Sequence, residues 1–131
     1  MVIDTSALVA ILQREPERDA MLSALARDPK RLVSAVTVVE AGMVLEGRFG
    51  PDARVDLELF IFHAGLTVTP FDGRQADAAL RAWRKFGKGR HPAQLNWGDC
   101  FVYGLAKAVG ESVLAKGRDF PQTDIPMVPL A

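Results

Sequence analysis

The chain has 131 residues, of which 49% are hydrophobic and 24% charged, and this size and composition exclude a disordered or fibrous protein while leaving room for one ordinary hydrophobic core. Sixteen basic residues balance sixteen acidic ones, so the net charge gives no sign of nucleic-acid binding and any such sign must be local. The lone Cys100 excludes an internal disulfide, and without a signal peptide or an apolar run of membrane length we expect a single cytoplasmic domain over residues 1–131 with no membrane contact.

Strand-like apolar runs alternate with helical patterns from the beginning of the chain. The first part predicts a strand over residues 1–4, a short helix over 6–13, a second helix from Pro16 to about residue 28, and a strand over 32–35. A helix over 36–49 follows and ends at Gly50 and Pro51. A further helix over 53–63 precedes Gly65.

The second part of the chain continues this alternation. A strand over 66–69 leads into a helix that Asp72 caps and that reaches about residue 86, and residues 87–95 form a loop with two glycines and a proline. Asn96 caps a helix to residue 109, and 112–115 and 127–129 are the last strand candidates. The order predicts the α/β class, with a mostly parallel sheet of about five strands joined by crossover helices.

Four carboxylates lie where such a sheet binds ligands, outside the carboxyl ends of its strands. Asp4 ends the first strand, Asp119 follows the fourth, and Asp99 lies in the first turn of a late helix. Glu40 lies early in the helix after the second strand and can point back, because helical side chains lean toward the N-terminus.

Each acid also has a purely structural explanation. Asp4 can cap the first helix, residues 37–40 and 96–99 both resemble capping boxes, and Asp119 can belong to a surface turn. Gathered at one edge, however, the four carboxylates would repel one another unless a cation neutralised them. Hard oxygen ligands without histidine or cysteine favour Mg²⁺ or Mn²⁺, and the chemistry indicated is phosphodiester hydrolysis.

Four short segments, in order and covering essentially the whole chain, resemble the PIN-domain toxins of bacterial toxin–antitoxin systems, the VapC type. They are residues 1–6 (MVIDTS), 34–40 (SAVTVVE), 96–101 (NWGDCF) and 116–120 (KGRDF) followed by 123–124. The resemblance implies a PIN fold, with a sheet flanked by helices in three layers, and a Mg²⁺- or Mn²⁺-dependent endoribonuclease that cleaves cellular RNA. It also implies inhibition by a cognate VapB-type antitoxin and a homodimer.

By the same resemblance, Asp4, Glu40 and Asp99 match the family's core acids and Asp119 matches the fourth. Thr5 or Ser6 matches a hydroxyl that supports the first acid, and Asn96 matches a polar residue near the third, where plain helix capping is an equal alternative. We expect Asp4 and Asp99 to be the principal metal ligands. Glu40 and Asp119 would complete the site, hold a second ion or orient the attacking water.

The fourth acid is the least certain match, because Arg118 stands where similar toxins often carry asparagine or glutamate. Asp124 is therefore kept as an alternative to Asp119. Among candidate RNA contacts, Lys116 and Arg118 lie nearest to the acids in the sequence. Lys88 and Arg90 belong to the basic segment 81–91, for which a solvated helix face with Trp83 and Phe86 in the core is the alternative.

The helix over 53–63 carries more apolar residues than one core-facing stripe needs. By the resemblance we expect a groove for an antitoxin segment between the early helices, and plain core packing is the alternative. The groove candidates are Leu8, Ile11, Leu12, Leu57, Phe60 and Ile61. A receiver or phosphatase domain fits less well because Asp4 is followed by Thr5 and Ser6, and a non-catalytic RNA-binding or scaffold domain is a further reading.

Overall fold

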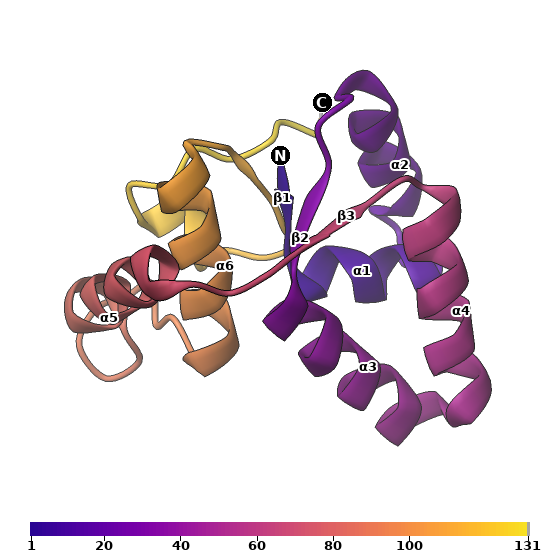
Figure 1. The fold of residues 1–131 in the computed structure, drawn as a ribbon, viewed down its shortest axis with the longest axis horizontal. Coiled ribbons are helices and arrows are strands. Elements are labelled where there is room, and N and C mark those ends of the chain that lie inside the picture. The colour runs from indigo at the N-terminus through magenta and orange to yellow at the C-terminus, as the bar shows by residue number, and fades with distance from the viewer. Residues whose placement is uncertain (131) are drawn as a thin grey trace.

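The computed structural model describes residues 1–130, and within them a four-stranded sheet forms the centre of the fold (Figure 1). The strands are β1 (Val2–Ile3), β2 (Leu32–Ser34), β3 (Thr67–Thr69) and β4 (Val113–Leu114). Their order is β3-β2-β1-β4, and every pairing is parallel. The α/β class is therefore confirmed. The fifth strand candidate, 127–129, contributes one isolated bridge between Met127 and Val113 in place of a strand.

Helices connect the strands close to the predicted positions. They are α1 (Thr5–Leu12), α2 (Arg18–Arg27), α3 (Ala35–Phe49), α4 (Pro51–His63), α5 (Gly73–Phe86) and α6 (Trp97–Val109), with a short 3-10 helix η1 (Phe120–Gln122) near the C-terminus. The chain turns from α3 into α4 at Gly50, whose φ of 89° is a conformation that favours glycine. Pro51 then occupies the first turn of α4, where its missing N–H costs nothing.

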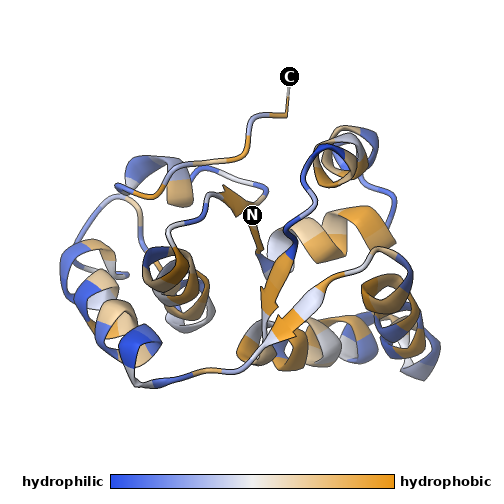
Figure 2. Cartoon of the chain, turned by 45° about the horizontal axis from the view of Figure 1, so that its top comes forward, coloured by the Kyte–Doolittle hydropathy of each residue, from blue (hydrophilic) through white to orange (hydrophobic). Residues whose placement is uncertain are grey.

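The sheet separates two apolar clusters, so the fold has three layers. Successive strand residues point to opposite faces: Ile3 packs with α1 to α4, whereas Val2 packs with α5 and α6. In β4, Leu114 likewise packs in the cluster of Ile3, and Val113 packs in the cluster of Val2. Figure 2 shows apolar strands between helices whose polar faces turn outward. Because all strands are parallel, their carboxyl ends, which lead into α1 and α3, open on one edge of the sheet.

Core packing accounts for half of the six groove candidates. Leu8, Ile11 and Leu57 are buried, while Leu12, Phe60 and Ile61 are partly exposed and pack against the same cluster. The surplus apolar surface of α4 lies instead on Val55, Leu59 and Phe62, which share one face of the helix at spacings of four and three residues. Within residues 1–130, none of the helices combines the length and apolar character needed to cross a membrane.

Candidate active site

Asp4 leaves the end of β1 and is buried at the start of α1. Its Oδ2 accepts hydrogen bonds from the Ser6 backbone N–H at 3.0 Å and from Ser6 Oγ at 2.5 Å, so it caps α1 as well as facing the site. Ser6 Oγ in turn accepts from the backbone N–H of Lys116 at 2.9 Å, which ties the loop after β4 to this point. Burial raises the pKa of Asp4, the hydrogen bonds from Ser6 oppose that shift, and the charge of Glu40 adds to it.

Glu40 lies on α3 and is held between two other elements. Thr5 Oγ1 donates to Glu40 Oε1 at 2.5 Å, and a Cβ placed on Gly98 of α6 would overlap the Glu40 carboxylate. The predicted capping box at residues 37–40 is wrong, because Ser34 caps α3 by accepting from Val36 N–H at 3.2 Å. Glu40 is thus free of any capping role and can serve the site.

Asp99 lies in the first turn of α6, and here the predicted capping box is confirmed. Asn96 Oδ1 accepts from the Asp99 N–H at 2.8 Å, and Asp99 Oδ2 accepts from the Asn96 N–H at 3.0 Å. The pKa of Asp99 is raised to about 7, chiefly by burial and also by the negative charges of Asp4, Asp119 and Glu40, while the hydrogen bond from the Asn96 backbone opposes the shift. The acids are therefore close enough to disfavour full ionisation together.

The two candidates for the fourth acid have different surroundings. Asp119 is exposed in the loop after β4, and its charge is one of those that raise the pKa of Asp99. Asp124 accepts a hydrogen bond from Tyr103 OH at 2.6 Å and pairs with Lys107 Nζ at 2.9 Å, which fastens the C-terminal segment to α6. The effect of its charge on Asp99 thus favours Asp119 over Asp124 as the fourth acid.

A hollow of about 350 Å³ lies at the carboxyl edge of the sheet, where Asp4, Glu40 and Asp99 meet. It is lined by three of the four predicted acids, all three predicted supporting residues and five further side chains: Asp4, Glu40, Asp99, Thr5, Ser6, Asn96, Val9, Glu15, Val44, Arg48 and Lys116. Asp119 lies outside this lining. Sequence reasoning missed Arg48, which the two-turn spacing from Glu40 on α3 could have revealed, and it missed Glu15 and Gly98, for which no local signal exists.

The donor chemistry of the hollow suits a hard divalent cation. Its carboxylate and hydroxyl oxygens are the ligands that Mg²⁺ and Mn²⁺ prefer, and a cation would neutralise the negative charges of Asp4, Asp119 and Glu40, which add to the effect of burial on the pKa of Asp99. No three histidine, cysteine or acidic side chains of residues 1–130 form a group that could hold an ion together. A site for Mg²⁺ needs fewer protein ligands, because this ion commonly takes one or two carboxylates and keeps several waters.

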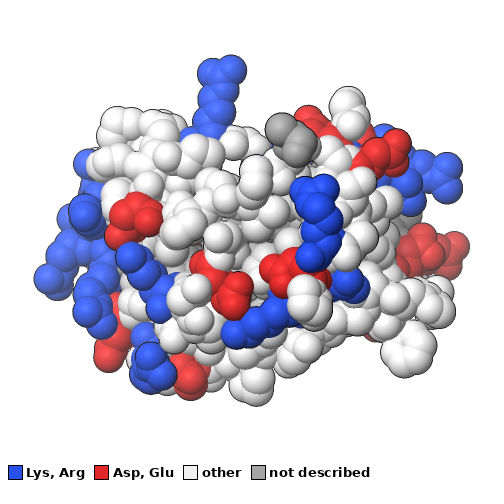
Figure 3. All heavy atoms as spheres, turned by 90° about the horizontal axis from the view of Figure 1, so that it is seen from above, with Lys and Arg blue, Asp and Glu red and all other residues white. Residues whose placement is uncertain are grey.

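The predicted basic RNA contacts lie in different places. Lys116 lines the hollow, where its Nζ pairs with Glu15 at 2.5 Å and Glu17 at 3.5 Å, while Arg118 is exposed on the following turn. Arg90 lies over the Trp83 ring at 4.1 Å, and Lys88 lines a separate apolar cavity. Acidic and basic side chains are interspersed over the face in Figure 3, and basic ones gather toward the side where α5 lies.

Comparisons with known proteins match nearly the whole chain. The family description "PIN domain" matches residues 1–126. The chain is 48% identical over 128 residues to Ribonuclease VapC of Mycolicibacterium smegmatis, covering 98% of this chain and 99% of that protein. It is 48% identical over 130 residues to Ribonuclease VapC30 of Mycobacterium tuberculosis H37Rv, covering 99% of each.

Two solved structures share the fold. VapC20 of Mycobacterium tuberculosis, a sarcin–ricin loop cleaving toxin, aligns with a TM-score of 0.75 at 17% identity over 95% of both chains. FitAcB from Neisseria gonorrhoeae aligns with a TM-score of 0.72 at 19% identity, covering 98% of this chain and 96% of that one. At these identities the likeness supports the fold and not the function.

Proposed function

We propose that this chain, which belongs to the PIN-domain family and within it to the VapC-type ribonuclease toxins, cleaves RNA as a Mg²⁺- or Mn²⁺-dependent endonuclease that a cognate antitoxin restrains. One observation carries the metal-dependent part of the proposal. Asp4 at the end of β1, Glu40 of α3 and Asp99 of α6 line one hollow together with hydroxyl groups. Burial, with a smaller contribution from repulsion by the neighbouring carboxylates, raises the pKa of Asp99 to about 7. A divalent cation would relieve that repulsion and serve hydrolysis at once.

Asp4 and Asp99 are proposed to hold the cation. Ser6 and Asn96 orient these two carboxylates through the hydrogen bonds that cap α1 and α6. When bound, Mg²⁺ or Mn²⁺ supplies charge stabilisation for the phosphate and lowers the pKa of a water. The proposed cation ligands thus lie at the starts of two helices, α1 and α6, whose rigid backbone holds them in place.

Glu40 and Asp119 are proposed to orient the attacking water and accept its proton. Glu40 lines the hollow, and its carboxylate is fixed by the hydrogen bond from Thr5 and by close packing against Gly98, which suits a positioned general base. Arg48 and Lys116 line the same hollow, and their charges favour a phosphate beside the acids. Lys116 would exchange its pairing with Glu15 for the phosphate, and Arg118 lies near enough in the chain to assist it.

The proposed antitoxin surface includes the exposed face of α4. Val55, Leu59 and Phe62 present an apolar stripe at helical spacing, the kind of surface on which an amphipathic segment can lie. A homodimer in the cytoplasm, where cellular RNA is found, remains part of the proposal.

Cleavage of RNA by purified protein tests the proposed activity. We expect single-stranded RNA to be cut with Mn²⁺ or Mg²⁺ and to stay intact with a chelator. Asp4→Asn and Asp99→Asn should each lower the rate about 10²-fold or more, whereas Asp56→Asn, an exposed acid on α4, should not. Binding of RNA without cleavage under any metal condition would favour the non-catalytic alternative.

A further inference from the structure

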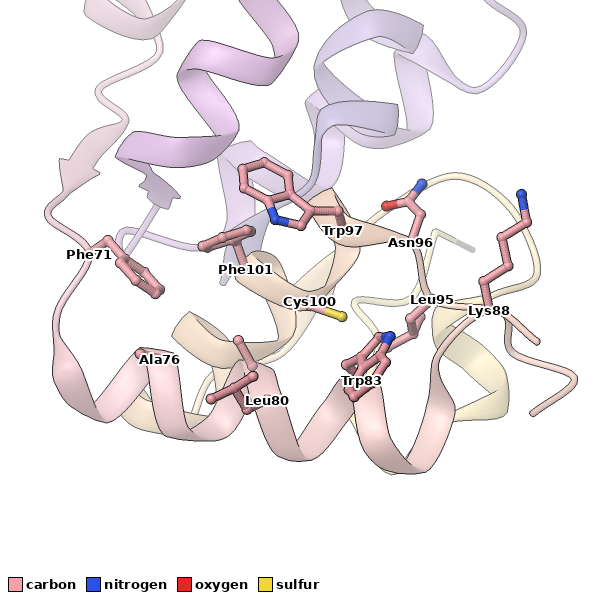
Figure 4. Close-up of a pocket in the computed structure, with 11 residues that line it drawn as sticks. Phe71, Ala76, Leu80, Trp83, Lys88, Leu95, Asn96, Trp97, Cys100 and Phe101 are labelled. Carbon is pink, nitrogen blue, oxygen red and sulfur yellow. The ribbon is translucent and has the colours of Figure 1, made fainter. Parts of the chain in front are cut away.

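A second cavity, of about 610 Å³, lies beside the acidic hollow and is walled by aromatic rings (Figure 4). It opens between the start of α6, the middle of α5 and the loop that joins them. Residues from each of these elements line it, among them Trp83, Lys88, Asn96, Trp97 and Phe101, and Phe71 joins them from the segment between β3 and α5. The catalytic roles assigned above use only Asn96 of this set.

Three of the rings, Trp97, Phe101 and Phe71, form one continuous surface, and the Trp83 ring, on which Arg90 lies at 4.1 Å, is on the other wall. Trp97 meets Phe101 at a centroid distance of 4.3 Å, and Phe101 meets Phe71 at 4.9 Å, both edge to face. Trp97 is nevertheless 70% exposed and Trp83 47% exposed, so the hydrophobic core does not account for them. Large apolar groups left in water beside a functional site commonly mark a binding surface.

The cavity is continuous with the candidate active site through one residue. Asn96 lines both the aromatic cavity and the acidic hollow, and Trp97 directly follows it at the start of α6. Figure 4 shows Asn96 and Lys88 at one end of the cavity, with Trp97 and Phe101 on one wall and Trp83 on the other. A chain that placed a phosphate at Asp99 would therefore bring its neighbouring group to the rings.

We propose that this aromatic cavity is a subsite for an unpaired base of the RNA next to the cleaved phosphodiester, with Trp97 stacking on the base and Lys88 meeting the adjoining phosphate. Every base has a flat face that can stack on an indole ring, and unpaired RNA exposes that face. The placement of Lys88 beside apolar rings suits a ligand that is both flat and anionic. This inference rests on the proposed RNA substrate, and it adds that the RNA must be single-stranded at the cut.

Tryptophan fluorescence tests the subsite directly, because the chain has only two tryptophans. In Trp83→Phe the emission comes from Trp97 alone. We expect a single-stranded RNA of ten mixed nucleotides, added in the presence of a chelator, to quench this emission saturably. An abasic strand of equal length and charge should leave it unchanged. Equal effects of the two strands, or no effect of either, would overturn the subsite.

Affinity measurements supply the second readout. Trp97→Ala should weaken binding of the same RNA about tenfold, while Trp97→Phe, which keeps a ring, should weaken it less. Phe49→Ala is the matched control, since Phe49 is an exposed aromatic on α3 outside the cavity, and it should bind as wild type does. Wild-type affinity in Trp97→Ala would contradict the proposal.

The main competing occupant of this face is a second copy of the chain, and light scattering at the same protein concentration identifies it. If Trp97→Ala turns a dimer into a monomer and leaves RNA affinity unchanged, the face is an interface between copies and the base subsite is refuted. The chelator separates this test from that of the proposed function. Base-dependent quenching without cleavage when Mn²⁺ is restored would refute the nuclease and leave the subsite standing.

Discussion

Gly98 on α6 packs so closely against Glu40 on α3 that a methyl group on Gly98 would overlap the Glu40 carboxylate. The absence of a side chain at this position lets an acid from one helix reach the first turn of the other. On its other side, the same carboxylate accepts a hydrogen bond from Thr5 Oγ1 at 2.5 Å. Glycine is required here because a side chain would not fit, and not because of its backbone conformation, since Gly98 lies within the regular helix α6.

Gly98→Ala should therefore displace Glu40 and lower the RNA cleavage rate by roughly 10²-fold, the effect of moving a catalytic group by about 1 Å. The fold should persist, since alanine favours a helix over glycine by about 1 kcal/mol and offsets part of the overlap. Gly47→Ala on α3 is the matched control, because nothing lies within 4 Å of its added Cβ. Single-turnover cleavage compares the two, and equal rates would show that the position of Glu40 is immaterial.

Asp119 and Asp124 should respond differently to the same substitution. Asp119→Asn should slow cleavage while thermal stability stays unchanged, because Asp119 is exposed and its proposed role is to handle the attacking water beside Asp99. Asp124→Asn should keep the cleavage rate and lose about 1 kcal/mol of stability, because it weakens the contacts to Tyr103 and Lys107. Cleavage kinetics and urea unfolding of both variants measure this, and the reverse pattern would assign the fourth acid to Asp124.

The metal-free protein should become less stable as the pH rises from about 4 to about 7, between the unfolded and the folded pKa of Asp99. Asp99 has an ordinary pKa of 3.8 when unfolded and a pKa of about 7 when folded, so between these values the folded state binds more protons. Stability from this group is complete below the unfolded pKa and is lost as the pH passes through the folded one. The raised pKa of Asp4 acts in the same direction.

Thermal unfolding with a chelator across this pH range measures the effect. Asp99→Asn should flatten the decline, and Asp56→Asn, whose side chain is exposed on α4, should follow the wild-type curve. Adding Mn²⁺ should raise the melting temperature most at the high end of the range, where the carboxylates are ionised. A decline that Asp99→Asn leaves untouched would place its origin in other groups.

The exposed stripe on α4 should bind the antitoxin. Phe62→Ser should weaken inhibition of RNA cleavage by the cognate antitoxin about tenfold or more, because exposed aromatic anchors often dominate binding energy. It should change stability by less than about 0.5 kcal/mol, since Phe62 is 79% exposed. Met43→Ser, 72% exposed on α3, is the control, and if it alone relieves inhibition the antitoxin binds there instead.

Helix caps and helix ends could be predicted from the sequence where residues close together in the chain determine them. The Asn96 cap of α6 and the helix break at Gly50 were predicted correctly, because each depends on contacts within one turn. The alternative reading of residues 37–40 as a capping box was wrong, because Ser34, one turn earlier, caps α3. The fifth strand, predicted over residues 127–129, forms only one bridge, between Met127 and Val113, because strand pairing depends on residues that are distant in the sequence.

The sequence by itself determined the α/β class and the family resemblance, because periodicity, caps and motif order are all local properties of the chain, and it named three of the acids that line the hollow, Asp4, Glu40 and Asp99. Only the tertiary structure decided what those acids touch. It brought Gly98 against Glu40, coupled Asp119 rather than Asp124 to Asp99, and buried Leu8, Ile11 and Leu57. The physical reason is that each of these outcomes depends on the packing of helices on both sides of the sheet, which no short segment specifies.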